Sequence, residues 1–383
     1  MPDQQTQAAA INADSAELSG LRAAINKFGA ACVEAIRQHF WFITIIMVYA
    51  GLAVVVGRLT GHSHVVNVNF YAAGFLVMLT TFAVALTLGH TIWMTVIVRP
   101  QGRLIPAIIE DYRTRFLRPR RIAAFLAVVS LKPFFFSAFS SFKRMIPYFN
   151  FWHWDETFKD FDKWLHFGRQ PWEWTHAVFG SPAASGAISF CYNAWYFVIF
   201  LTFIWQAFNT TRPRLRAQYI YAFIFTWMLL GTVLGTALSS AGPVYYGRVV
   251  GGIDPYAPLM HRLYEINEVW KIWALPVQER LWAIYESRGL MLGSGISAMP
   301  SLHVATTTLT MILAWKYNKV VGIAMTIFLI TIQIGSVHLG WHYAIDGYLS
   351  FALVFVIWAA VGRVLIWRER RRQATDSPLL EAA

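Results

Sequence analysis

The chain has 383 residues, of which 57% are hydrophobic and only 14% are charged. Soluble globular proteins carry roughly 25% charged residues, so this composition excludes a disordered chain and an ordinary water-soluble enzyme and leaves an integral membrane protein. The formal net charge of +12 would indicate a nucleic-acid partner only if the basic residues were clustered on a soluble surface. The two cysteines lie far apart in the sequence, which excludes a disulfide framework.

The N-terminal segment 1–38 is mostly polar and has no short basic-then-apolar leader. Between residues 15 and 38, apolar side chains recur at helical spacing with basic residues between them. This pattern predicts a helix that either lies in the cytoplasmic membrane interface or extends the first transmembrane span.

A helix needs roughly 20 apolar residues to cross a bilayer core about 30 Å thick. The remaining sequence contains eight apolar runs of about that length, which predicts an all-α, polytopic membrane protein. These runs are Phe40–Gly57, Phe70–Val98, Ile122–Phe142 (interrupted at Lys132–Pro133), Gly186–Phe208, Ala217–Ser239, Ser301–Trp315, Val320–Val337 and Ile345–Trp367. We therefore divide the chain into the N-terminal segment 1–38, two extra helices with a basic loop over 39–121, a six-helix catalytic core over 122–367 and a basic tail over 368–383.

The basic residues predict which ends of the spans face the cytoplasm. Arginines and lysines gather between spans two and three, four and five, six and seven, and in the tail. All four positions fall on one side if eight helices alternate, and a basic excess marks the cytoplasmic side. Both termini are then cytoplasmic, the charge is explained by topology, and no nucleic-acid partner is expected.

Two long loops, 143–185 and 240–299, lie on the opposite side and are rich in aromatic residues. In the first, Phe158 and Phe161 recur at helical spacing, with Asp160 and Asp162 on the opposite face. Such helices float at the headgroup level, where they either anchor the protein or form a lid over a lipid-binding cleft.

Two polar segments stand at the outer ends of the last three spans. One runs from Ser297 to Ala305 and the other from His338 to Gly347. Ionisable residues at membrane depth are functional candidates, because an unpaired buried charge costs several kcal/mol. By the predicted topology both segments reach the same surface.

The spacing within these segments predicts phosphoryl-transfer chemistry. His342 and Asp346 are four residues apart, so on a helix the carboxylate orients the imidazole for nucleophilic attack. His303 supplies a second imidazole that protonates a leaving oxygen. The hydroxyl of Ser301, with the N–H groups of a helix start, forms a cradle for phosphate. The alternative is purely structural: polar residues at helix ends, satisfied by water.

The two segments together resemble the second and third signatures of the type 2 phosphatidic acid phosphatase superfamily, usually Pro-Ser-Gly-His and Ser-Arg-(x5)-His-(x3)-Asp. The forms found here are Met-Pro-Ser-Leu-His-Val-Ala and His-Tyr-(x2)-Asp-Gly. They are more similar to the inositol phosphorylceramide synthase (aureobasidin-resistance) branch. The resemblance covers about 122–367 and implies a six-helix core in which His342 is the nucleophile, Asp346 its partner and His303 the general acid, without a metal.

The chain departs from that family pattern at two phosphate-binding positions. Gly335-Ser336 stands where the third signature has Ser-Arg, and the first signature, Lys-(x6)-Arg-Pro, is absent in that form. The transferred phosphate needs a cationic donor, so Arg248 is the first candidate to bind it. His338 either contacts the phosphate or caps its helix.

The sequence therefore predicts an enzyme that acts through a phosphohistidine on a lipid phosphoester at the outer face, most simply that of a bacterial inner membrane, without a cofactor. Its partners are a membrane lipid substrate and, if the phospho-headgroup is transferred, a lipid alcohol acceptor. The alternatives are hydrolysis of phosphatidate or polyprenyl diphosphate, a zinc enzyme with His303, His338, His342 and Asp346 as ligands, and a non-catalytic transporter.

Overall fold

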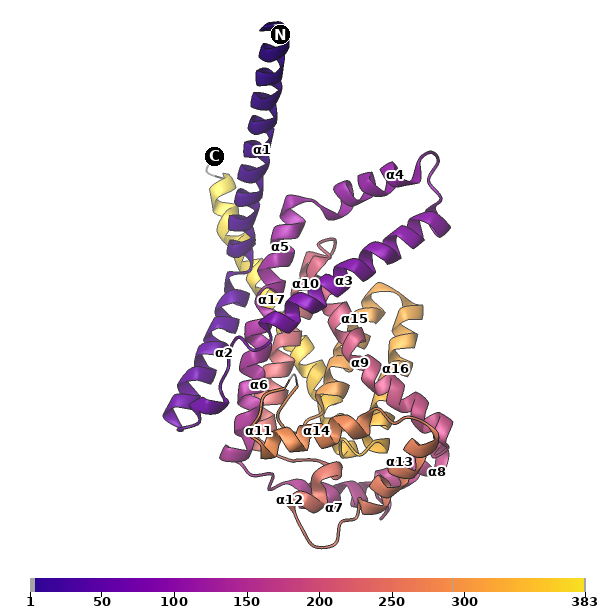
Figure 1. Cartoon of the computed structure of the whole chain (residues 1–383). Coiled ribbons are helices and arrows are strands. Elements are labelled where there is room, and N and C mark those ends of the chain that lie inside the picture. Colours follow the sequence, from indigo (N-terminus) through magenta and orange to yellow (C-terminus); the bar gives the residue numbers. More distant parts are fainter. Residues whose placement is uncertain (1–3, 292, 382–383) are drawn as a thin grey trace.

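The computed structural model describes residues 4–291 and 293–381, and those residues form helices and loops with no strand. Figure 1 shows a bundle of long helices with a layer of short helices across one end, while α1 and the end of α17 lie at the other. The α-helices are α1 (Gln4–Gln38), α2 (Phe40–Leu59), α3 (Ala72–Trp93), α4 (Leu104–Asp111), α5 (Pro119–Val129), α6 (Lys132–Phe149), α7 (Asp155–Leu165), α8 (Pro171–Phe179), α9 (Pro182–Phe208), α10 (Pro213–Thr226), α11 (Gly235–Ala237), α12 (Tyr246–Val249), α13 (Ala257–Val269), α14 (Ala274–Glu286), α15 (Leu302–Tyr317), α16 (Lys319–His338) and α17 (Ala344–Glu381).

Seven segments of the described chain are long and apolar enough to cross a membrane. They are Phe40–Leu59, Ala72–Val98, Pro119–Phe149, Pro182–Phe208, Pro213–Ala237, Lys319–His338 and Ala344–Arg371. They coincide with seven of the eight predicted spans, which confirms an all-α, polytopic membrane protein. The predicted break in the third span is also present, because α5 ends at Val129 and α6 begins at Lys132 with a proline in its first turn.

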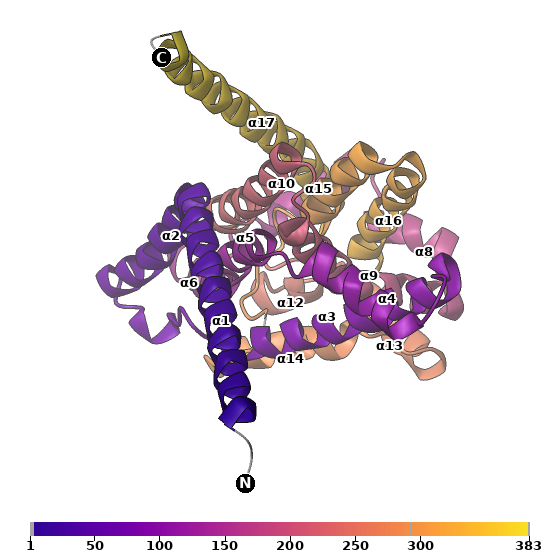
Figure 2. The ribbon, with the colours of Figure 1, turned by 90° about the horizontal axis from the view of Figure 1, so that it is seen from above.

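The eighth predicted span, α15, has only 16 residues. Residues 304–314 are all buried, and the helix packs against α9, α10, α16 and α17. Figure 2, which looks at the molecule from above, shows α15 beside α10 and α16. Because α15 is enclosed by other helices, it needs no lipid-facing surface of full bilayer thickness.

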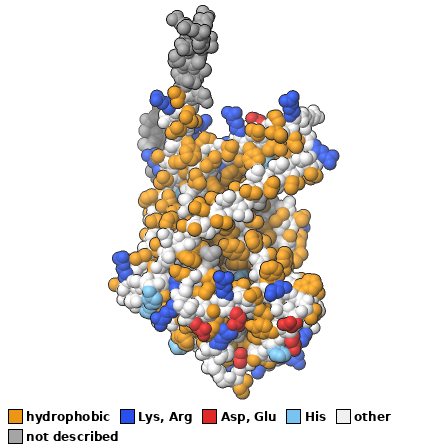
Figure 3. Space-filling view, in the orientation of Figure 1, with side chains coloured by type: hydrophobic (Ala, Val, Ile, Leu, Met, Phe, Trp, Pro, Cys, Tyr) orange, Lys and Arg blue, Asp and Glu red, His pale blue; other side chains and the backbone are white. Residues whose placement is uncertain are grey.

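The surface carries the pattern expected of a membrane protein. Figure 3 shows an apolar band between two polar rims. Lysine and arginine dominate the rim on the side of α1, whereas acidic and basic side chains mix on the rim formed by the short helices. A belt of this kind matches the hydrocarbon core and its two interfaces.

The N-terminal helix follows the second of its two predicted arrangements. α1 runs almost directly into α2, packs against α5 through Ala31 and Ala35, and then projects from the bundle (Figures 1 and 2). It is therefore an extension of the first span.

The predicted orientation of the first outer helix is wrong. The side of α7 that faces the protein carries Asp155, Phe158 and Asp162, with exposed fractions of 0%, 6% and 1%, whereas Phe161 and Trp164 are exposed. Asp162 is thus buried, although the periodicity of the aromatic residues had placed it on the solvated face. Asp162 is buried because backbone N–H groups of neighbouring segments, which the sequence pattern of α7 does not reveal, need hydrogen-bond acceptors on this face of α7.

Candidate active site

A cavity of about 500 Å³ lies between the long helices and the layer of short helices. Side chains of α3, α6, α9 and α15 line it from the bundle, while Val277 and Leu281 of α14 line it from the outer layer. His303 and His342 both line this cavity. Part of the second outer loop therefore borders the space that the two histidines share.

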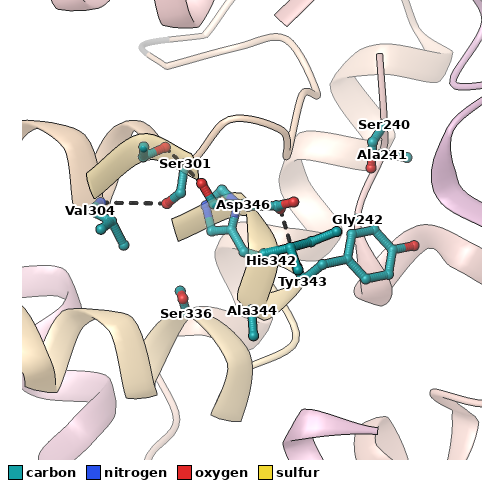
Figure 4. A network of polar contacts seen from close by, with 12 residues as sticks. Ser240, Ala241, Gly242, Ser301, Val304, Ser336, His342, Tyr343, Ala344 and Asp346 are labelled. Atoms are coloured by element: carbon teal, nitrogen blue, oxygen red, sulfur yellow. Dashed lines mark hydrogen bonds and ion pairs between the residues drawn. The ribbon is translucent and has the colours of Figure 1, made fainter. Parts of the chain in front are cut away.

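His342 lies in the short loop between α16 and α17. Two successive backbone N–H groups, those of Trp341 and His342, donate to the carbonyl of Ser336 at 3.0 Å and fix the loop. His342 Nδ1 lies 3.1 Å from Asp346 Oδ2, and the N–H of Tyr343 donates to the same oxygen at 3.1 Å (Figure 4). The pair forms across the first turn of α17, because His342 precedes that helix; it does not form along a helix face, as the spacing had suggested.

This contact determines which nitrogen of His342 is available. Nδ1 is directed at Asp346, so Nε2 remains for an electrophile. Burial, and after it the ammonium of Lys143, lower the pKa of His342, while a hydrogen bond with the backbone of Ala298 opposes the shift. The imidazole is therefore neutral near pH 7 and carries a lone pair.

His303 lies in the first turn of α15 and is held by aromatic rings. Its imidazole stacks on Tyr192, with ring centroids 4.5 Å apart, and lies 4.1 Å from the ring centroid of Trp195. The centroids of His303 and His342 are 5.7 Å apart. The two imidazoles come from different helices and are close enough to contact one phosphate.

Ser301 joins the two segments instead of lining the cavity. Its N–H donates to the backbone carbonyl of Asp346 at 3.2 Å, and its hydroxyl accepts the N–H of Val304 at 3.4 Å as the N-cap of α15 (Figure 4). The residue is completely buried. The structure thus brings Ser301 beside Asp346 but does not place its hydroxyl where a phosphate would lie.

Two carboxylates of α7, which the sequence did not single out as functional residues, hold the loops around the site. Asp155 accepts hydrogen bonds from Ser240 Oγ, the N–H groups of Ala241 and Gly242, and the Tyr343 hydroxyl, at 2.7–2.9 Å. Burial raises the pKa of Asp155 even though these four donors favour its charged form. The only feature of the sequence that could have indicated a role for Asp155 is its position beside the aromatic residues of the first outer loop.

Asp162 holds the start of α17 in place by accepting backbone hydrogen bonds. Its two oxygens accept the N–H groups of Ala344 and Ile345 at 2.7 and 3.1 Å, which are among the unpaired donors of a helix N-terminus. Burial raises the pKa of Asp162 to about 7, and the nearby Asp346 carboxyl adds to the shift. α7 therefore clamps both chain segments that adjoin His342.

Lys143 of α6 is a further cavity-lining residue that the sequence analysis missed. The loop at Gly295 packs against it so closely that a Cβ there would lie 2.9 Å from Lys143 Cγ. The signal that could have found it is helical spacing. Lys132, Phe136, Phe139 and Lys143 occupy one face of α6, and all four line the cavity.

The structure does not place Arg248 or His338 at the cavity. Arg248 forms an ion pair with Glu279 at 2.8 Å, is exposed, and does not line the cavity. His338 is buried behind the loop, where it stacks on His176 with ring centroids 3.8 Å apart and lies 2.8 Å from Ser185 Oγ. Of the two predicted roles of His338, a structural one at the helix end fits this position.

The residues of the site do not fit a zinc centre. Over residues 4–291 and 293–381, no group of three or more histidine, cysteine or acidic side chains is close enough to hold one metal ion. His338 lies in the stack with His176, so the four ligands that the zinc alternative required do not converge.

Gly242 gives a direct test of how closely the loops must approach. Its φ is +94°, and a Cβ there would lie 2.7 Å from the Trp341 carbonyl, beside His342. We expect Gly242→Ala to displace the His342 loop and to lower kcat/KM by about 100-fold, since a shift near 1 Å can cost that much. Turnover and the melting temperature are to be measured together.

The matched control is Gly251→Ala. Gly251 also has a positive φ, +77°, but a Cβ there would meet nothing within 4 Å. Both variants bear backbone strain because φ is positive at each position. The strain is larger at Gly242, whose ψ of 168° places it in a region that essentially only glycine adopts, so the control separates a positive φ from the combined strain and crowding at Gly242. Equal activities of the two variants would refute the proposed displacement.

Comparison with known families gives one match. A family model described as the PAP2 superfamily matches residues 156–360, which is more than half of the chain. The matched region includes His303, His342 and Asp346. No curated protein and no solved structure matches the chain significantly.

Proposed function

The chain belongs to the PAP2 superfamily, and from this we propose that it is a membrane enzyme that moves a lipid-linked phosphate through a phosphohistidine. The observation that carries the proposal is the pair of imidazoles, 5.7 Å apart at one cavity, with Asp346 behind one of them. A carboxylate, a neutral imidazole and a second imidazole are the parts that a covalent phosphoryl-transfer cycle needs.

In the first step Nε2 of His342 attacks phosphorus. A P–N bond forms, the P–O bond to the leaving alcohol breaks, and His303 gives a proton to the departing oxygen. Burial lowers the pKa of His303, so this histidine must take up that proton when the anionic substrate binds. Asp346 stabilises the positive charge that develops on His342. In the second step an acceptor hydroxyl attacks the same phosphorus, the P–N bond breaks, and the hydroxyl proton passes to His303.

The cavity supports a lipid as the substrate. Beside the histidines it is lined by aromatic side chains, among them Phe136, Phe139 and Trp227, and its wall includes α3, which packs loosely on the bundle. A hydrocarbon chain can occupy such a surface while its phosphate stays at the histidines. We propose transfer of a phospho-headgroup to an alcohol acceptor, as in the inositol phosphorylceramide synthase branch, over hydrolysis of phosphatidate or polyprenyl diphosphate.

The site is proposed to face the outside of the membrane. The cavity lies at the end of the bundle formed by the short helices, away from the rim where basic side chains dominate (Figures 1 and 3). By the positive-inside rule that basic rim is cytoplasmic, as are both termini. In a bacterial inner membrane the site would then be periplasmic.

The test uses the full-length protein in detergent. It is incubated with labelled phosphatidylinositol plus ceramide or diacylglycerol, with phosphatidate and with polyprenyl diphosphate, each with and without chelator. A new phospholipid supports transfer, whereas release of free phosphate supports the hydrolytic alternative. No turnover of any of these lipids, or loss of all turnover with chelator, would overturn the proposal.

A further inference from the structure

Resting on the proposed function, we infer that the hydroxyl of Tyr71 binds an acyl carbonyl of the phosphorylated lipid, so that the site takes lipids with ester or amide linkages. Tyr71 is the N-cap of α3 and lines the cavity together with Ser140 of α6. Both residues precede the matched region 156–360. Membership of the family therefore says nothing about what these two residues do.

The start of α3 is held on α6 by serine side chains. The N–H of Tyr71 donates to Ser137 Oγ at 3.0 Å, and the N–H of Asn67 donates to Ser141 Oγ at the same distance. The ring of Tyr71 lies beside Phe136, with ring centroids 6.3 Å apart. Backbone and ring contacts together fix the phenol, so its hydroxyl has a defined position at the cavity.

The hydroxyl of Tyr71 is surrounded by more hydrogen-bond donors than acceptors. Its oxygen accepts the N–H of Gly293 at 2.6 Å and lies 3.0 Å from Ser140 Oγ. One of the two hydroxyl protons forms the contact between Tyr71 and Ser140, and no group in residues 4–291 and 293–381 accepts the other. Ser140 is only 5% exposed, whereas Tyr71 is half-buried. If Ser140 donates to Tyr71, the free proton is that of the more accessible phenol.

A hydrocarbon chain cannot satisfy this proton, because it has no hydrogen-bond acceptor. Much of the cavity lining is aromatic, and a donor that remains unpaired in such surroundings is unfavourable. The acyl ester of a glycerolipid and the amide of a ceramide each offer a carbonyl oxygen that a phenol O–H can reach with good geometry. A polyprenyl chain offers no such oxygen.

The position of the phenol suits a carbonyl near the phosphate. Ser140 follows Phe139, and a Cβ at Gly231 would lie 2.6 Å from the ring of Phe139 and 2.8 Å from Leu302, the residue before His303. The hydroxyl pair is therefore at the level of the histidines along the bundle. The nearest acyl carbonyl oxygen of these lipids is about six bonds from phosphorus, roughly 6–7 Å. That length fits inside a cavity of about 500 Å³, which is on the order of 10 Å wide.

The test compares ester and ether lipids in one assay on the full-length protein. Phosphatidylinositol and phosphatidate are each offered as the diacyl ester and as the dialkyl ether of equal chain length, with diacylglycerol as the acceptor throughout. The proteins are wild type, Tyr71→Phe and the control Tyr264→Phe. Tyr264 is 44% exposed on α13, and its hydroxyl donates to Glu279 outside the cavity. Wild type and the control are expected to prefer the ester by about 5- to 10-fold in kcat/KM, the size of one neutral hydrogen bond.

Tyr71→Phe is expected to remove this preference. The variant should lose about 5- to 10-fold with the ester and change little with the ether, because only the ester offers a carbonyl. The substitution keeps the ring, and Gly293 is exposed, so water can replace the acceptor of its N–H. A purely structural effect would lower both activities equally and leave the ratio of ester to ether turnover unchanged. An unchanged ratio in Tyr71→Phe would overturn the inference.

Ceramide 1-phosphate, which carries an amide in place of the ester, identifies the source of the carbonyl. Loss of activity in Tyr71→Phe with the ester, the amide or both supports the inference, and the lipid with the larger loss is the preferred source. Equal turnover of ester and ether by wild type would overturn the inference and leave the proposed function in place. No turnover of any of these lipids would overturn both.

Discussion

Replacement of His342 by glutamine is expected to abolish turnover of any lipid phosphate, by at least about 10⁴-fold. Glutamine preserves polarity and approximate size, but its amide nitrogen has no lone pair available to attack phosphorus. The second imidazole cannot take over, because His303 stacks on Tyr192 and Trp195 and has no carboxylate beside it. Turnover and acid-labile labelling of the protein by a phosphate-labelled substrate are to be measured together.

The control for this variant is His261→Gln. His261 lies on α13 with a side chain that is 77% exposed, and it pairs only with Glu265 on its own helix. Wild type and the control should give acid-labile labelling, whereas His342→Gln should give none. If His342→Gln is labelled to the same extent as wild type, the nucleophile is a different residue.

Replacement of Asp155 by alanine is expected to destabilise the protein by about 3–5 kcal/mol. The change removes one buried carboxylate and leaves four buried donors, those of Ser240, Ala241, Gly242 and Tyr343, without their acceptor. Each buried unsatisfied group costs about 1–3 kcal/mol, and partial relaxation brings the sum into this range. The melting temperature in detergent and the yield of folded protein measure the effect.

Asp160→Ala on the same helix is the matched control. Asp160 is 66% exposed and pairs only with its neighbour Lys159, and surface pairs of this kind contribute about 1 kcal/mol or less. The two aspartates differ by five positions but occupy opposite environments. Equal melting temperatures for the two variants would show that the Asp155 hydrogen bonds do not support the fold.

These two variants probe different properties of one site. His342 is expected to affect chemistry with little change in stability, whereas Asp155 affects the position of the loops through Tyr343, the residue after His342. If an Asp155→Asn variant folds, it should bind lipid with reduced kcat, because the asparagine amide cannot accept all four hydrogen bonds in the same geometry. A pattern of this kind is typical of a positioning residue.

The sequence by itself determined the membrane class, the positions of the spans and the two segments that meet at the cavity. These features are local or compositional: a run of apolar residues specifies a span, and a proline in the first turn specifies where α6 begins. The pairing of His342 with Asp346 also depends on a separation of four residues, so a short segment was enough to predict it, although the pair forms at the helix start.

Only the tertiary structure decided which cations and carboxylates surround the histidines. Arg248, the first candidate for binding phosphate, pairs with Glu279 outside the cavity. Lys143, which precedes His303 by 160 residues, lines the cavity. The sequence analysis placed Asp162 on a solvated helix face and gave Asp155 no role. Periodicity shows which residues share a helix face, but it does not show what that face contacts in the folded protein. Burial of α7 against the start of α17 gives these carboxylates partners nearly 190 residues away, and no local pattern carries information about contacts at that separation.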